Sequence, residues 1–148
     1  MNHVKPAAAA LPAAFAETPA LYRALGAAQM AINSEGIEPR LRHLITLRAS
    51  QINGCGFCVG MHLAEARRDS ETQERLDKIV VWDQVDDFTE REKAALEWTE
   101  ALTALDRKTG YRGLRTKLRT HFSDKEIGVL TAIVGMINLW NRVQVSHH

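Results

Sequence analysis

The chain has few cysteines, no long apolar run and almost no net charge, and each of these absences narrows its function. Two cysteines in 148 residues are too few for the disulfide framework of a small secreted domain. No run approaches the roughly 20 apolar residues of a membrane-spanning helix. Nineteen basic residues against eighteen acidic ones leave a net charge of +1, so no overall field favours nucleic acid or an anionic membrane. We therefore expect neither a nucleic-acid partner nor a membrane partner.

The alanine-rich start of the chain resembles a secretory signal peptide only superficially. Its apolar part is interrupted by Pro6, Pro12 and Glu17, and alanine is weakly hydrophobic. We interpret residues 1–18 as a flexible N-terminal arm of a single domain that spans residues 1–148. The expected compartment is the cytoplasm.

Strand patterns are also missing, because no stretch alternates apolar and polar residues, whereas helical spacing recurs throughout. Proline suits the first turn of a helix, and Pro19 and Pro39 open the first two predicted helices. Asn53 and Gly54 interrupt the second, and a third helix begins near Cys55.

Capping-box patterns predict three later helix starts. They pair Ser70 with Gln73, Thr89 with Glu92, and Ser123 with Glu126. Residues 106–113 form a polar break, and 114–121 fit another short helix. The predicted fold is an all-α bundle of about six or seven helices.

The two cysteines lie two residues apart, in the run NGCGFCVGMH (53–62). Positions i, i+3 and i+7 of a helix fall within an arc of roughly 60°, so Cys55, Cys58 and His62 share one face. Gly54 permits a sharp turn before this helix. The free N–H groups and the dipole of the first turn favour a thiolate, and His62 can accept the proton of Cys58. The pattern predicts a dithiol that cycles with a disulfide.

Other interpretations of the cysteine pair stay open at this point. Free cysteines are often buried core residues. A structural zinc site needs four ligands, and only His43 is a plausible fourth beside Cys55, Cys58 and His62. A thioredoxin-like domain would place the pair beside a βαβ pattern, which this chain lacks. We expect no metal and no bound cofactor.

The run RLRHLITLRASQINGCGFCVGMHLAEARR (40–68) resembles the alkylhydroperoxidase D (AhpD) core of the carboxymuconolactone decarboxylase-like superfamily. Trp82, the run FTEREKAALEWTEALT (88–103) and the run INLWNR (137–142) extend the resemblance over most of residues 20–142. The resemblance implies an all-α AhpD-like fold, homo-oligomers (trimers or hexamers), and peroxidase activity through the cysteine pair. It implies a peroxide substrate and a dithiol reductant, either a small thiol or a lipoylated or thioredoxin-like protein donor.

The family motif is a glutamate, eleven residues, Cys, two residues, Cys, three residues and His. By position, the resemblance makes Cys58 the peroxidatic cysteine, Cys55 the resolving cysteine and His62 part of the proton relay. The glutamate position holds His43 instead. An imidazole titrates near neutrality and can still pass a proton, but a second imidazole is a poorer partner for an imidazolium than a carboxylate. We therefore expect altered pH dependence or weakened turnover, unless Glu65, Glu97 or Glu100 supplies a carboxylate from another helix.

The leading hypothesis is a thiol-dependent peroxidase of the AhpD type, with Cys58, Cys55, His62 and His43 as its catalytic residues. The alternative is a non-catalytic, redox-responsive oligomer with a reversible Cys55–Cys58 disulfide. Lactone decarboxylation, the other enzymatic branch of the superfamily, does not depend on a cysteine pair.

Three remaining sets of residues are best interpreted as structural. The basic segment 111–122 is typical of a solvated helix face. The three tryptophans fit core or subunit-interface positions. The polar residues of the INLWNR run fit buried groups at a subunit contact. The basic segment has the sequence YRGLRTKLRTHF. The tryptophans are Trp82, Trp98 and Trp140, and the polar residues of the INLWNR run are Asn138, Asn141 and Arg142.

Overall fold

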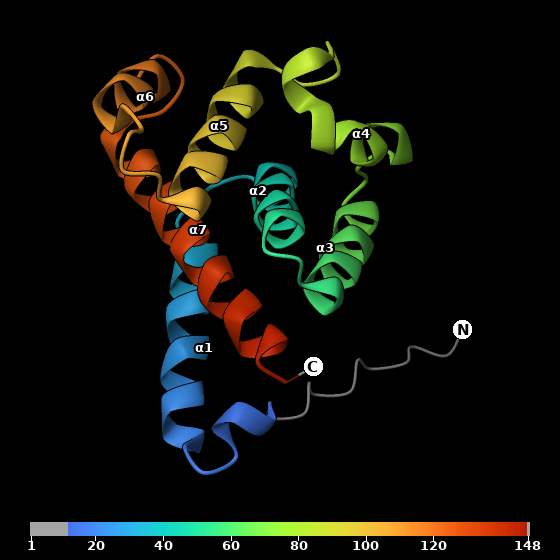
Figure 1. The fold of residues 1–148 in the computed structure, drawn as a ribbon, viewed down its shortest axis with the longest axis vertical. Coiled ribbons are helices and arrows are strands. Elements are labelled where there is room, and N and C mark those ends of the chain that lie inside the picture. Colours follow the sequence, from blue (N-terminus) through green and yellow to red (C-terminus); the bar gives the residue numbers. More distant parts are fainter. Residues whose placement is uncertain (1–11, 148) are drawn as a thin grey trace.

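A computed structural model describes residues 12–147, and within this part of the chain all regular structure is helical. The predicted all-α bundle is therefore confirmed (Figure 1). The elements are η1 (Ala13–Phe15), α1 (Pro19–Asn33), α2 (Pro39–Ile52), α3 (Gly56–Arg68), α4 (Gln73–Lys78), η2 (Ile79–Gln84), α5 (Glu90–Ala104), α6 (Tyr111–Leu118) and α7 (Asp124–Val145). None of the helices in residues 12–147 combines the length and the apolarity that crossing a membrane requires.

Helix α2 lies at the centre of the bundle, packed against α3, α5 and α7 (Figure 1). Eight of its 14 residues are buried. Leu41 and Ile45 belong to an apolar cluster shared with α5, α6 and α7. Leu44 and Leu47 belong to a second cluster, shared with α3, α4, η2 and α5. The same helix therefore organises both halves of the core and holds α3 in place.

The turn between α2 and α3 is set by local backbone bonds. Gly54 has a φ of +67°, a conformation that glycine adopts without steric cost. The Cys55 N–H donates to the Ser50 carbonyl at 3.1 Å, and the Gly54 N–H donates to the Gln51 carbonyl at 3.2 Å. This pair of bonds is a Schellman motif, which closes the last turn of α2. Cys55 then caps α3, so the interruption predicted at residues 53 and 54 is confirmed.

One predicted capping box is wrong. Ser70 has a φ of +70° and completes a second Schellman motif at the end of α3, in which the Glu71 N–H donates to the Ala66 carbonyl at 2.9 Å. It therefore cannot cap the next helix, and the Thr72 hydroxyl caps α4 instead. The boxes at Thr89 and Ser123 are both present and begin α5 and α7 as predicted.

The helix predicted over 114–121 begins earlier than expected, at Tyr111. The Tyr111 ring contacts Trp98 edge-on, and its hydroxyl donates to the Ala101 carbonyl at 3.2 Å. These contacts with α5 extend the helix into the polar break. Tertiary packing explains the difference, because the local sequence around Gly110 gives no helix-start signal.

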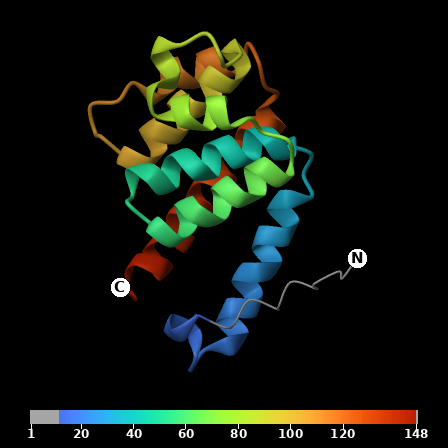
Figure 2. The same ribbon diagram turned by 90° about the vertical axis from the view of Figure 1, so that its right-hand side faces the viewer.

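Helix α1 starts at Pro19 as predicted but buries none of its residues in the described chain. It extends away from the bundle (Figure 2), and its contact with the bundle is with α7. Trp140 joins the two helices, since its indole N–H donates to Gln29 at 2.9 Å and its ring contacts Tyr22. Of the predicted N-terminal arm, residues 1–11 lie outside the described chain. The remainder contains η1, whose Phe15 packs on Tyr22.

Candidate active site at the start of helix α3

Cys55 and Cys58 are joined by a disulfide, and their Cα atoms lie 5.3 Å apart. Cys55 is the N-cap of α3, and its sulfur accepts the Cys58 N–H at 3.3 Å. Cys58 lies in the first turn, where unpaired N–H groups and the helix dipole stabilise negative charge. The two residues are almost completely buried, at 0% and 1% exposure. The sequence therefore placed both sulfurs correctly at the start of one helix.

His62 lies one turn after Cys58 and is buried, as the shared face requires. Its Nδ1 lies 3.1 Å from Glu65 Oε2. Its Nε2 is buried and has no hydrogen-bond partner among the described residues. A buried polar atom without a partner is uncommon in native proteins and calls for an explanation.

His43 reaches the same site from α2. Its Nε2 lies 2.5 Å from Asp69 Oδ2, and its Nδ1 lies 3.9 Å from Glu65 Oε2. The His43 side chain is 7% exposed, whereas those of Glu65 and Asp69 are 32% and 40% exposed. Two imidazoles and two carboxylates thus alternate, in the order His62, Glu65, His43 and Asp69.

Both carboxylates are stabilised in their ionised form. The hydrogen bond from His62 lowers the pKa of Glu65 most; partial burial opposes it, and the charges of His62, His43 and Arg68 add to it. The hydrogen bond from His43 likewise lowers the pKa of Asp69. An ionised carboxylate only accepts hydrogen bonds, so the ring nitrogens that it contacts are N–H donors. In the neutral ring of His62 the proton is therefore on Nδ1, and Nε2 carries a lone pair.

Of the three glutamates considered as replacements for the motif carboxylate, Glu65 is the one that lies beside the imidazoles, but it is on the same helix as His62 and not on another. The other two candidates are engaged elsewhere. Glu97 contacts Lys117 at 2.5 Å, and Glu100 accepts from Arg48 and from the Trp82 indole, each at 2.8 Å.

Asp69 was missed by the sequence analysis, although its spacing carries a signal. Cys55, Cys58, His62, Glu65 and Asp69 follow steps of three, four, three and four residues, which place them on one stripe of a helix. Continuing the stripe beyond His62 would have identified both carboxylates. What the stripe cannot indicate is which of them contacts His43, because that depends on how α2 packs on α3.

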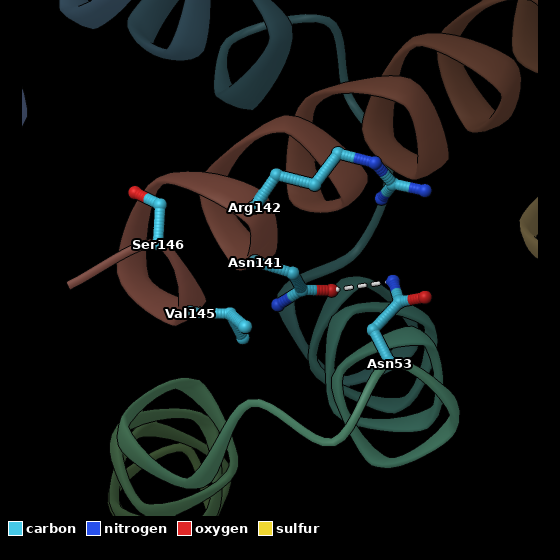
Figure 3. A pocket seen from close by; sticks show the side chains of 5 residues that line it. All are labelled: Asn53, Asn141, Arg142, Val145 and Ser146. Carbon is cyan, nitrogen blue, oxygen red and sulfur yellow. Dashed lines mark hydrogen bonds between the residues drawn. The ribbon is translucent and has the colours of Figure 1, made fainter. Parts of the chain in front are cut away.

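An amide network holds the turn before the cysteines against α7. The Asn53 side chain donates to both Asn138 and Asn141 at 2.9 Å, and Asn141 donates to Ser50 at 3.0 Å. Figure 3 shows the Asn53–Asn141 hydrogen bond beside a pocket between the end of α7 and the α2–α3 turn, with Arg142 and Val145 on its α7 side. The pocket has a volume of ≈ 360 Å³. The polar residues of the INLWNR run therefore bond groups of their own chain, and their expected place at a subunit contact stays a prediction.

The remaining residues lie at positions compatible with the structural interpretation made from the sequence. Trp82 and Trp98 are core residues of the two clusters. In the basic segment, Lys117 and Arg119 pair with Glu97 and Asp124 at exposed positions. Within residues 12–147, no three or more His, Cys, Asp or Glu side chains are grouped so that they could hold a metal ion.

The fold and this site define an AhpD-like protein with a C-x-x-C pair, and comparison with known proteins agrees. Residues 16–101 match the model of the carboxymuconolactone decarboxylase family, and the chain belongs to this family. The uncharacterized protein YdfG of Bacillus subtilis (strain 168) is 37% identical over 105 residues, which are 71% of each chain.

Two solved structures illustrate the range of the fold. ATU0492 from Agrobacterium tumefaciens, a protein of unknown function provisionally assigned to antioxidant defence as AhpD, is 39% identical. The match covers 90% of this chain and 92% of that one, with a TM-score of 0.85. The debrominase Bmp8 is 20% identical, with a TM-score of 0.78 over 88% of this chain and 70% of that one. At that identity the likeness establishes the fold alone.

Proposed function

We propose that the protein is a thiol-dependent peroxidase that reduces hydrogen peroxide or an organic hydroperoxide. The observation that carries the proposal is the unpartnered Nε2 of His62. The atom lies in a ring fixed by Glu65, one turn after a cysteine whose sulfur is in a disulfide and bears no proton. In the dithiol form the Cys58 thiol supplies the missing donor, and proton transfer to Nε2 leaves the reactive thiolate.

In the proposed cycle, the Cys58 thiolate attacks one peroxide oxygen, the O–O bond breaks and an S–O bond forms. The leaving alkoxide takes the proton from His62 and departs as the alcohol, or as water when the substrate is hydrogen peroxide. Cys55 then loses its proton to His62 and attacks the Cys58 sulfur. The S–S bond forms, the S–O bond breaks, and the leaving hydroxide takes that proton from His62 and departs as water. The peroxide gains two electrons, the two thiols lose them, and the disulfide results.

An external dithiol must return two electrons by thiol–disulfide exchange. A lipoylated or thioredoxin-like protein, or a small dithiol, fits this requirement, and no metal or bound cofactor takes part. The cytoplasm suits such a cycle, because thiols there are kept reduced and disulfides turn over.

The direct test is steady-state consumption of hydrogen peroxide by the full chain, with dihydrolipoamide as the reductant. We expect Cys58→Ser to abolish turnover and His62→Ala to reduce it about 100-fold, within the range typical of a lost general base. His147→Ala, at an exposed histidine near the chain end, is the matched control and should equal the parent. Parent activity no greater than that of Cys58→Ser would refute the peroxidase assignment.

Two observations favour the second candidate function, a redox-responsive oligomer without turnover. Both cysteines are nearly inaccessible in the described structure, and α1 presents apolar side chains, including Leu21 and Met30, to solvent. Such a face suits a second copy of the chain. This candidate predicts that oxidation changes the oligomeric state, measured by light scattering, while peroxide consumption remains at the background rate.

A further inference from the structure

Asp69 lies outside the cysteine motif and is nonetheless joined to it through His43. It is the C-cap of α3, eleven residues after Cys58, and its carboxylate contacts His43 Nε2 at 2.5 Å. The local backbone explains this position. The Schellman motif at Ser70 ends the helix immediately after Asp69 and leaves this side chain at the last position of the stripe.

The geometry shows why a second carboxylate matters. A single oxygen, Glu65 Oε2, lies 3.1 Å from His62 Nδ1 and 3.9 Å from His43 Nδ1. Two imidazoles therefore face one carboxylate oxygen, and the shorter contact belongs to His62. Because Asp69 binds the opposite nitrogen of His43, that ring has a partner of its own.

We propose that Asp69 is a positioning residue: it holds His43 away from Glu65, so that Glu65 serves His62 alone. This inference deepens the proposed function and rests on it. Without Asp69, His43 turns its Nδ1–H to Glu65 and competes with His62 for the same oxygen. The weaker hold on His62 makes its ring a poorer acceptor for the Cys58 proton, because a carboxylate partner is what favours the imidazolium.

The charged groups around this contact come from both helices. Arg68 of α3 acts on both carboxylates, and Arg42 of α2 acts on Asp69. Simple removal of a negative charge from this neighbourhood would favour the Cys58 thiolate, since like charges disfavour ionisation. The positioning role predicts the opposite direction, and the sign of the effect separates the two accounts.

The experiment measures the rate of iodoacetamide alkylation against pH in the full chain carrying Cys55→Ser, in which Cys58 is the one remaining cysteine. We expect Asp69→Asn to raise the midpoint of this pH profile by about half a pH unit to one pH unit. Alkylation at pH 7 then slows by up to about three- to ten-fold. Asp69→Glu should restore part of the shift. Asp83→Asn, at an exposed aspartate of η2, is the matched control and should leave the midpoint unchanged.

A second background tests the route of the effect. In Glu65→Gln, Asp69→Asn should cause no further shift, because the contact that it protects is already lost. An unchanged midpoint, a downward shift, or an equal upward shift in the Glu65→Gln background would each overturn the inference. Circular dichroism verifies folding, and Asp69→Ser replaces the asparagine variant if that variant unfolds.

The outcome also separates this inference from the proposed function. If the parent consumes peroxide and its Cys58 reacts below the range of a free thiol, while Asp69→Asn leaves the midpoint unchanged, only the role of Asp69 fails. If the parent Cys58 ionises as a free thiol, near pH 8.5, and no peroxide is consumed, both fail.

Discussion

The two ends of helix α3 differ in almost every physical respect. Its first turn holds two buried sulfurs, with exposures of 0% and 1%. Its last turn holds the carboxylates of Glu65 and Asp69, about a third exposed and paired with imidazoles. His62 lies between the two ends, and its ring is hydrogen-bonded to Glu65 at the charged end. The two sulfurs that we propose to react therefore lie about two helical turns from the carboxylates that we propose to tune them.

The largest expected effect comes from replacing one of the two buried cysteines, because the two are expected to have different roles. Cys58→Ser should abolish reaction with peroxide altogether. Cys55→Ser should lose steady-state turnover but still react once, because the attacking sulfur remains and only the resolving one is missing. Stopped-flow consumption of one equivalent of peroxide, together with dimedone labelling of the sulfenic acid, measures this. Single-turnover reactivity in Cys58→Ser and not in Cys55→Ser would reverse the two roles.

Restoring the glutamate of the family motif tests the charged end. His43→Glu places a third carboxylate beside Glu65 and Asp69 and removes the imidazole that lies between them. We expect the free energy of unfolding at pH 7 to fall by about 2 kcal/mol, since a poorly paired charge is left in a largely buried position. Urea denaturation measures it, with the near-isosteric His43→Gln as the control. A gain in peroxide turnover at neutral pH would show instead that His43 limits the relay.

The smallest effect concerns stability in acid. Because the pKa of Glu65 is lowered in the folded protein, its contribution is fully present above the unfolded pKa, about 4.3, and is lost as pH falls through the folded value. Glu65→Gln should therefore destabilise the protein at pH 7 but not at pH 3. The loss of stability between pH 7 and pH 3 should then be smaller than in the parent. Urea midpoints from pH 3 to 7 measure this. Glu74→Gln, at an exposed glutamate of α4, should give a curve parallel to that of the parent.

Much of the fold could be predicted because its signals are local. Pro19 and Pro39 begin helices, two capping boxes form as expected, and the spacing of Cys55, Cys58 and His62 places them on one face. Ser70 shows where local reasoning fails. Its neighbours fit a capping box, but the end of α3 requires this residue in the left-handed region.

The charged end of the site could be predicted only in part. The stripe on α3 contains Glu65 and Asp69, but the pairing of each carboxylate with a particular imidazole depends on the packing of α2 on α3. That packing follows from residues such as Leu44 and Leu47, which lie far in sequence from the carboxylates that they bring to His43. The roles of Cys55, Cys58, His62 and His43 remain predictions, which the kinetic experiments above can test.

Cys55 lies between α2 and α3 and bonds to both, and this has a consequence for repeated redox cycles. Its amide hydrogen completes the end of α2 by bonding Ser50, while its sulfur begins α3. The main chain at this residue is thus anchored by a bond that does not depend on the oxidation state. Opening the disulfide should therefore rotate side chains rather than unwind either helix, and the two thiols stay close enough to close again without a folding step.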